Sequence, residues 1–214
     1  MPRAERKAQL VQVAEEIFSQ QGYAGTTMEA VAEAAGITKP VIYDLFGSKE
    51  GLLAACLGKA RAELLGALRN AWRSAPTGTG LQGMHRAGLV AFFDFMDGHA
   101  AVWRAIVEDQ SVYNGGPISE VRVAQSELVV EALRQHPELV DVPPVLVEGA
   151  VQAIIGACER VAAWRLGHPE VSAEAAAELV SALTWGGLNN LGTLPLAVAD
   201  RPGAGSTLGL VAGL

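Results

Sequence analysis

Apolar residues recur at helical spacing from the beginning of the chain. Leu10, Ala14, Ile17 and Phe18 share one side of an expected first helix, which we place up to Gly22, and charged residues occupy its other side. Alternation of apolar and polar residues, the sign of a strand, is nowhere sustained beyond a few positions. The pattern therefore predicts an all-α fold.

Two short helical patterns follow, each with its own start and stop signals. Thr26 or Thr27 is expected to cap the first of them, which Gly36 ends, and Thr38 is expected to cap the second, which Gly47 ends. Glycine adopts the positive φ of a helix stop without steric cost. Two capped helices joined by so short a turn predict a helix-turn-helix.

A long helix is expected next, from a cap at Ser48 towards Trp72. At about 1.5 Å per residue it spans more than 30 Å, which is enough to join two lobes. After a break at 76–80, further helices are expected over 81–97, 100–110, 118–135 and 145–166, and a last one after Ser172. We divide the chain into a helix-turn-helix domain at 1–50, a larger helical domain at 51–194, and a loosely docked or flexible tail at 195–214.

Charge is distributed unevenly along the 214 residues. The whole chain carries a net charge of -7, yet residues 1–61 hold seven basic and seven acidic side chains. An acidic body with a neutral N-terminal segment can present a few cations to phosphates, although this supports DNA binding only weakly. The two cysteines, Cys56 and Cys158, are isolated among apolar neighbours and are expected to be buried thiols in a reduced cytoplasm. No signal peptide or membrane span is expected.

The first quarter of the chain resembles the tetracycline-repressor (TetR) family of bacterial regulators. More than a dozen residues match the family's N-terminal pattern in register and without a gap. They are Leu10, Ala14, Phe18, Gly22-Tyr23, Thr26-Thr27, Val31-Ala32, Ala35-Gly36, Tyr43, Phe46, Ser48-Lys49-Glu50 and Leu52-Leu53. From about Leu81 on, the likeness is mainly one of helix number and length. The resemblance implies a three-helix helix-turn-helix lobe joined by a long helix to a larger helical bundle.

The resemblance also implies which residues meet double-stranded DNA. Its backbone contacts are Thr26, Thr27, Tyr43 and Lys49, and the residues that face base edges in the major groove are Thr38, Lys39, Pro40 and Val41. Leu45 departs from the family pattern, because members often have His or Tyr there and the leucine supplies no polar contact. Asp44, beside the expected phosphate face, should point to solvent.

Two body helices are apolar almost all round, over 145–166 and after Ser172. One face of each can serve the core of the protomer, and the family pairs the other with a symmetry mate. We therefore expect a homodimer on a pseudo-palindromic operator. The alternative is that both helices are central in a large monomer. The candidate interface residues are Val151, Ile155, Cys158, Leu179, Leu183 and Leu188.

Aromatic and thioether side chains gather in the body, where the family holds a small-molecule effector. Phe92, Met96, Trp103 and Trp164 are the candidate effector residues, with Gln125, Glu159 or Arg104 as polar groups. The alternative for each apolar residue is an ordinary core position.

Signatures of catalysis are missing from the sequence. It lacks the common nucleophile, phosphate-loop, zinc-protease and dinucleotide motifs, and its four histidines are remote from one another. We expect no enzyme activity, metal or cofactor. The prediction is a transcriptional regulator, a repressor that a small apolar or amphipathic effector releases from DNA. The alternative is a helical small-molecule-binding or catalytic protein whose N-terminal lobe has lost DNA binding.

Overall fold

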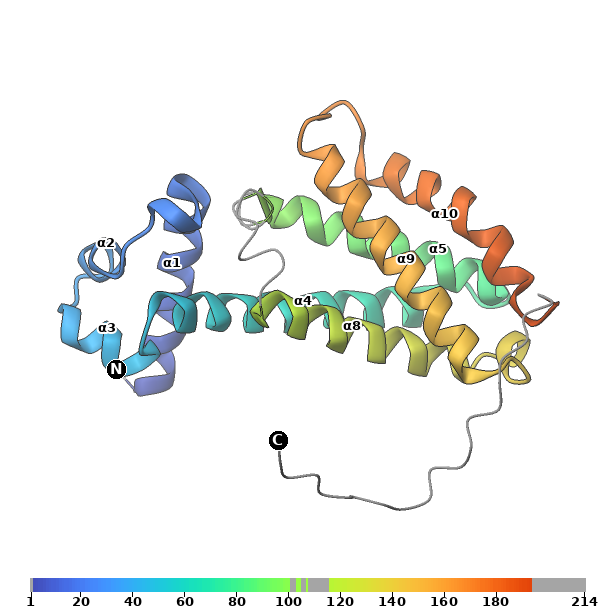
Figure 1. The fold of residues 1–214 in the computed structure, drawn as a ribbon, viewed down its shortest axis with the longest axis horizontal. Coiled ribbons are helices and arrows are strands. Elements are labelled where there is room, and N and C mark those ends of the chain that lie inside the picture. Colours follow the sequence, from blue (N-terminus) through green and yellow to red (C-terminus); the bar gives the residue numbers. More distant parts are fainter. Residues whose placement is uncertain (1, 101–102, 105–106, 108–115, 194–214) are drawn as a thin grey trace, which may run out of the picture.

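The structure is a computed structural model that describes residues 2–100, 103–104, 107 and 116–193. Every regular element in these ranges is a helix, as Figure 1 shows, so the all-α prediction is confirmed. Most of the expected helix over 100–110 and the whole tail at 195–214 lie outside the described residues. The elements are α1 (Arg3–Gly25), α2 (Met28–Ala34), α3 (Lys39–Phe46), α4 (Lys49–Ser74), α5 (Gly80–Gly98), α8 (Gly116–Arg134), η1 (Pro137–Leu139), α9 (Pro144–Arg165), α10 (Ala173–Asn189) and η2 (Leu191–Thr193).

Local signals in the sequence set the boundaries of the N-terminal helices. The Thr27 hydroxyl accepts a hydrogen bond from the Ala30 amide at 3.1 Å, and the Ser48 hydroxyl caps α4 in the same way. Gly36 and Gly47 end α2 and α3 with φ values of 66° and 74°. The expected side-chain cap at Thr38 was wrong, because its hydroxyl makes no hydrogen bond to the start of α3.

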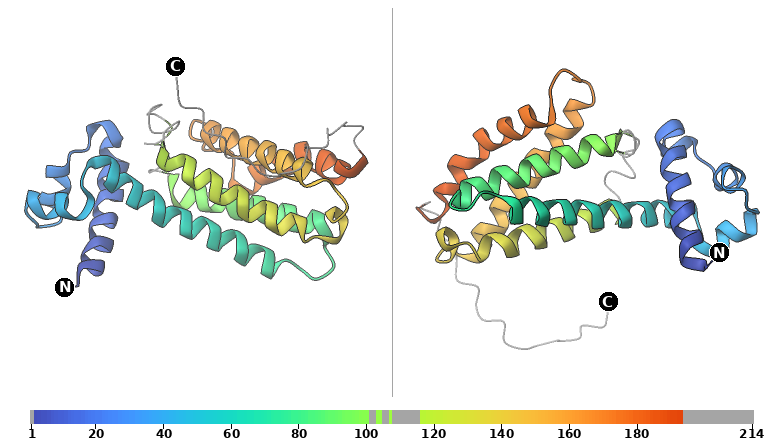
Figure 2. Two further views of the ribbon diagram at one scale, coloured as in Figure 1. Left: turned by 60° about the horizontal axis from the view of Figure 1, so that its bottom comes forward. Right: turned by 180° about the vertical axis from the view of Figure 1, so that it is seen from behind.

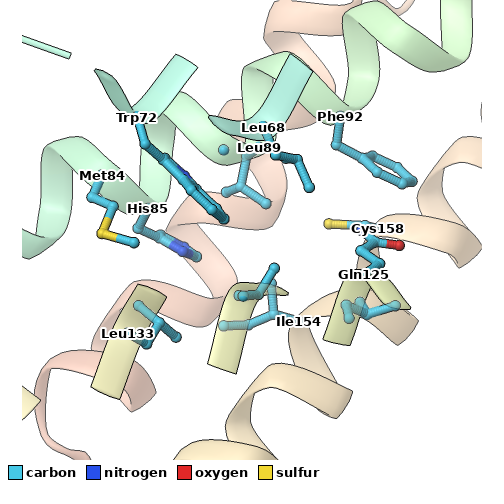
Figure 3. A pocket seen from close by; sticks show the side chains of 13 residues that line it. Leu68, Trp72, Met84, His85, Leu89, Phe92, Gln125, Leu133, Ile154 and Cys158 are labelled. Atoms are coloured by element: carbon cyan, nitrogen blue, oxygen red, sulfur yellow. The ribbon is translucent and has the colours of Figure 1, made fainter. Parts of the chain in front are cut away.

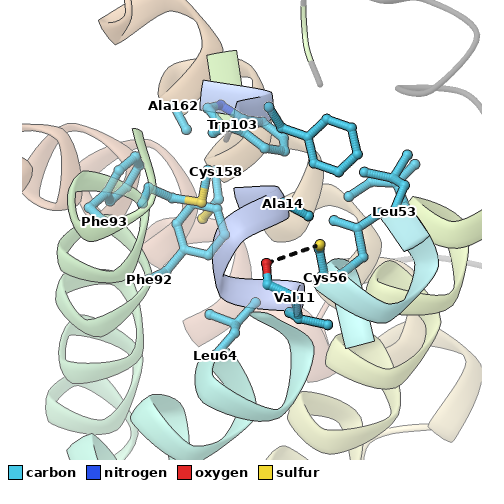
Figure 4. Packing of buried hydrophobic residues seen from close by; sticks show 14 of the residues in the cluster. Val11, Ala14, Leu53, Cys56, Leu64, Phe92, Phe93, Trp103, Cys158 and Ala162 are labelled. Carbon is cyan, nitrogen blue, oxygen red and sulfur yellow. Dashed lines mark hydrogen bonds between the residues drawn. The ribbon is translucent and has the colours of Figure 1, made fainter. Parts of the chain in front are cut away.

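The α4 helix is common to both parts of the molecule. Figures 1 and 2 show it running from α1–α3 along the length of the helical body. Leu53 and Cys56 near its start pack against α1, where the Cys56 thiol donates to the Val11 carbonyl at 3.8 Å (Figure 4), and Leu64 and Leu68 pack in the body. One hydrophobic cluster therefore extends from the N-terminal helices into the body without interruption.

The body packs α5, α8, α9 and α10 around the second half of α4. The α5 helix lies between α4 and α10, and α8 lies against both α4 and α9 (Figure 2). A second hydrophobic cluster, which includes Val147, Val151 and Leu188, closes the end of the body that is farther from α1–α3. The body is thus held together by contacts between helices that are distant in sequence.

Two glycine-to-alanine changes should have opposite effects on stability. Gly36→Ala places a β-carbon on a residue at φ 66°, which should lower the free energy of unfolding by about 1–2 kcal/mol. Gly66→Ala lies inside α4 with no heavy atom within 4 Å of the new β-carbon, and should raise it by up to about 1 kcal/mol. Denaturant unfolding measures both, and equal effects would contradict the assigned turn.

Candidate DNA-binding surface and effector cavity

The α3 helix presents an exposed polar edge beside the start of α2. Thr27, Thr38, Lys39 and Pro40 are exposed, as is Tyr43, whereas Ile42 on the opposite side of α3 is completely buried. The burial of Ile42 fixes how α3 sits on the lobe, and the turn at Gly36 fixes its angle to α2. The exposed edge is therefore a rigid surface built by two helices.

Lys39 is the cation at the centre of this edge. Its ammonium pairs with the Glu29 carboxylate of α2 and lies 5.7 Å from the centre of the Tyr43 ring. The hydrogen bond between the two side chains lowers the pKa of Glu29 and raises that of Lys39. Both groups are exposed, so solvent screens their attraction and the ammonium can exchange its partner for a base or a phosphate.

Two of the predicted DNA-contact residues already have partners inside the lobe. The Thr26 side chain is 1 % exposed and its hydroxyl donates to the Gly22 carbonyl at 2.8 Å. The Lys49 ammonium donates to the Tyr23 and Thr26 carbonyls at 2.8 and 3.0 Å, and so neutralises the carbonyl end of α1. Both residues thereby attach α1 to the starts of α2 and α4.

Asp44 points to solvent, as expected from its place beside the cationic edge. Its carboxylate accepts a hydrogen bond from the Arg3 guanidinium at 2.7 Å, and Arg3 also donates to the Asp44 carbonyl at 3.1 Å. The start of α1 is thus held against α3. This pairing brings a second cation next to the exposed edge and offsets the charge of the carboxylate.

Two small cavities lie in the body, each lined by α4, α5, α8 and α9. The Trp72 cavity (Figure 3) has a volume of about 50 Å³ and includes Leu68, Trp72, Met84, His85 and Cys158 in its walls. The Trp103 cavity has a volume of about 60 Å³ and lies nearer to the N-terminal helices, since Leu57 and Leu64 of α4 line it. Phe92 and Gln125 line both cavities, so the two spaces adjoin at these residues.

Three of the four candidate effector residues come together around the Trp103 cavity. Phe92, Met96 and Trp103 line it, together with the predicted polar groups Gln125 and Glu159. Trp164 does not, because its ring is 44 % exposed and stacks on His168 at 4.2 Å. Arg104 lies in a separate surface groove, where it donates to the Leu166 carbonyl at 3.2 Å.

Several polar groups in the cavity walls were not singled out from the sequence. Arg122 forms an ion pair with Glu159 at 2.8 Å. His99 faces the Glu63 carboxylate of α4 with Nε2 at 3.0 Å and the Phe95 carbonyl with Nδ1 at 2.9 Å. No local sequence signal could have found them, because each pairing joins helices that are far apart in the chain.

His85 is a buried neutral base in the wall of the Trp72 cavity. The Thr184 hydroxyl donates to the Val180 carbonyl at 2.7 Å, so the 2.9 Å contact between His85 Nε2 and Thr184 Oγ1 requires Nε2 to carry a hydrogen and donate. Burial lowers the pKa of the imidazole, and burial likewise raises the pKa of the Cys56 and Cys158 thiols to about 12. Both thiols are buried, as predicted.

Only two of the six predicted interface residues lie on the outward faces of α9 and α10. Val151, Ile155, Cys158 and Leu188, four of the six predicted interface residues, are buried inside the protomer. Leu179 and Leu183 are 43 % and 72 % exposed. Exposed small residues on the same two helices include Gly149, Ala153, Gly156, Ala175, Ala182 and Gly186.

Within the described residues, no three or more His, Cys, Asp or Glu side chains are grouped so that they could hold a metal ion. None of the described helices is both long and apolar enough to cross a bilayer.

The fold and the exposed α3 edge define a helix-turn-helix protein with a larger helical body, and comparison with known proteins identifies the family. The model of bacterial regulatory proteins of the tetR family matches residues 10–56, and a tetracyclin repressor-like C-terminal domain matches residues 81–187. The chain belongs to the TetR family, and it is a DNA-binding transcriptional regulator.

Relatives span nearly the whole chain. The HTH-type transcriptional activator FasR of Mycolicibacterium smegmatis is 29% identical over 194 residues, which cover 89% of this chain and 86% of the relative. The HTH-type transcriptional regulator EthR of the same organism is 25% identical over 91% of this chain and 90% of its own length. The crystal structure of a TetR-like transcriptional regulator from Rhodococcus sp. RHA1 is 30% identical, with a TM-score of 0.65, over 88% of this chain and 98% of that structure.

The neutral His85 should make stability depend on pH. Its folded pKa is depressed, so below the unfolded value of about 6.5 the unfolded chain binds more protons, and the free energy of unfolding should fall as pH falls from 7.5 to 5. This single group contributes at most about 1.4 kcal/mol per pH unit. Urea unfolding across this range should give a shallower pH dependence for His85→Gln than for wild type. Parallel curves for the two proteins would contradict the buried neutral imidazole.

Proposed function

We propose that this regulator binds a pseudo-palindromic operator as a homodimer and that a small apolar or amphipathic effector in the body releases it. The observation that carries the proposal is the position of α4. The same helix packs against the helix-turn-helix at its start and lines both cavities farther along. A molecule that displaces α4 in the body must also shift the α3 edge that reads DNA.

The exposed edge of α3 supports a division of labour on the operator. Thr27 and Tyr43 are suited to the phosphate backbone, and Thr38, Lys39, Pro40 and Val41 to base edges. Because the Thr38 hydroxyl makes no capping bond, it can serve a base or a phosphate. In this proposal Thr26 and Lys49 act indirectly, since their internal hydrogen bonds position the helices that carry the contacts.

Glu29 adds a condition to DNA binding by Lys39. In the free protein the Lys39 ammonium is paired with this carboxylate, and a guanine O6 or N7 atom must share or replace it. The pair keeps Lys39 directed at the exposed edge in the absence of DNA. The exchange replaces a solvent-exposed ion pair that contributes little to stability.

The outer faces of α9 and α10 support the homodimer. Small residues such as Gly156 and Ala182 allow close helix approach, and Leu179 and Leu183 supply apolar area that is exposed in the protomer. Trp164 lies on the same side of α9 as Gly156 and Arg160, and its exposed ring fits the rim of this face better than an effector cavity. A two-fold pairing here would double the number of α3 helices on one duplex.

The small volume of the cavities supports a mechanism by displacement. Pockets for drug-sized ligands measure roughly 300–1,000 Å³, whereas these cavities measure about 50 and 60 Å³. An effector must therefore separate the body helices, and the expanded conformation is the one it selects. Side chains also link this region to α1, because His99 contacts Glu63 at 3.0 Å and Lys59 of α4 binds Glu15 of α1 at 2.6 Å.

Release of DNA by an effector does not itself decide the sign of regulation. The relative FasR is named an activator, whereas we propose repression for this chain. The same helix-turn-helix blocks or recruits polymerase according to where its operator lies in the promoter. Footprinting on the regulated promoter therefore tests the repressor proposal separately from DNA binding.

Loss of the α3 contacts should weaken operator binding. Lys39→Ala combined with Tyr43→Ala should reduce affinity for DNA from its own promoter region at least tenfold and make the dependence of affinity on salt shallower, because one cation and one backbone contact are lost. Fluorescence anisotropy at several salt concentrations measures both quantities. Arg69→Ala removes an exposed cation from α4 and serves as the control. Unchanged binding by the double variant would refute the assigned surface.

Charge on the outer face of α10 should separate the protomers. Leu183→Glu should give a folded monomer by analytical ultracentrifugation, because a carboxylate would be buried in the proposed interface without a partner. Its operator affinity should fall, since one protomer can engage only one half-site. The same change at Val140, an exposed residue outside this face, should leave the dimer intact. A dimeric Leu183→Glu protein would exclude this interface.

A further inference from the structure

Gln125 is a buried amide in an otherwise apolar region of the body. Its side chain is 5 % exposed and lies on α8 where the two cavities adjoin. Figure 3 shows it near Phe92 and Cys158, at the opposite end of the Trp72 cavity from Trp72 and Met84. A glutamine in such surroundings ordinarily satisfies its amide with hydrogen bonds.

The Gln125 amide has no hydrogen-bond partner among the residues that the structure describes. The nitrogen and oxygen of this amide are also not completely enclosed by protein atoms. The amide therefore faces the free space of the cavities. Leaving it unpaired there costs free energy, which a partner inside the cavity would recover.

The neighbouring polar groups are already committed. Arg122 is bound to Glu159, and His99 to Glu63. Burial keeps His85, in the wall of the Trp72 cavity, neutral. Among the described residues that line the two cavities, no side chain therefore offers a free charge to an ionic ligand group. Gln125 offers an uncharged donor and acceptor where the two apolar spaces adjoin.

We infer that Gln125 selects effectors with an uncharged hydrogen-bonding group, such as an amide, in the middle of an elongated apolar molecule. The apolar arms would occupy the Trp72 and Trp103 cavities on either side, and the central group would pair with the Gln125 amide. The glutamine amide can turn to present either its N–H or its carbonyl oxygen, so it suits an amide in either direction. This inference rests on the proposed function, because it specifies the effector of the same body.

Length supports an elongated molecule over a compact one. The cavities follow α4 from Leu57 to Trp72, and these fifteen residue steps correspond to about 22 Å at 1.5 Å per residue. The cavities have volumes of only about 50 and 60 Å³, so a slender chain requires less separation of the helices than a compact ring system would. A group that met Gln125 from such a chain would necessarily lie away from its ends.

The test compares two slender probes in two proteins. The probes are N-butylhexanamide and butyl hexyl sulfide, which share an apolar outline and differ in the central hydrogen-bonding group. The proteins are wild type and Gln125→Leu, a change that keeps the volume and removes the amide. Affinities are measured by the fluorescence of Trp72 and Trp103, which line the cavities.

The ratio of amide affinity to sulfide affinity should be about tenfold or more higher in wild type than in Gln125→Leu. Gln125→Leu should melt at the wild-type temperature or above without a probe, since it loses an unpaired buried amide. Gln82→Leu, the same change at an exposed position of α5, should keep the wild-type ratio. Equal ratios in wild type and Gln125→Leu, or no binding of the amide to wild type, would overturn the inference.

Operator binding by the same preparations distinguishes a failure of effector selection by Gln125 from a failure of the proposed function. Wild type that binds operator but shows no dependence of the ratio on Gln125 disproves only the effector selection. Wild type that does not bind its operator refutes the proposed function itself. If wild type binds its operator and the affinity ratio depends on Gln125, the amide probe should release wild type from DNA at a lower concentration than it releases Gln125→Leu.

Discussion

The burial of α4 in one continuous hydrophobic core is the constraint on which the rest of the structure depends. A helix that begins against α1 and continues through the body cannot move at one end only, because its leucines are packed along the whole length. Close-packed interiors transmit displacement instead of absorbing it. In the proposed function, the connection between effector binding and DNA binding is thus a property of the core, and no special hinge is needed to explain it.

Polar contacts at the start and in the middle of α4 add to this connection. At its start, the Lys49 ammonium is hydrogen-bonded to carbonyls at the end of α1. In its middle, Lys59 pairs with Glu15 on α1, and Glu63, one turn further along, contacts both Lys59 and His99 beside the Trp103 cavity. These groups hold α1 and α5 on defined sides of α4.

Local sequence patterns predicted the N-terminal lobe well, because its geometry depends on short-range chemistry. Caps at Thr27 and Ser48 and positive-φ glycines at 36 and 47 act within a few residues of themselves. Thr38 is the exception, since a residue typical of caps left its hydroxyl unbonded. Predictions for the body were less accurate. Trp164 was grouped with Trp103 by residue type alone, although the two rings lie in different environments.

By itself, the sequence determined the helical fold, the helix-turn-helix and the family. Helical periodicity, caps and a register of matched residues each depend on residues that are close together in the chain. Tertiary structure alone decided which faces are outward and which polar groups meet. An α9 helix that is apolar almost all round does not reveal which of its sides is covered, and only packing showed that Val151 and Ile155 face inward. The same is true of Gln125. The sequence shows that Gln125 carries a polar amide. Its position between two cavities, and its lack of a partner among the described residues, depend on how α4, α5 and α9 pack around α8.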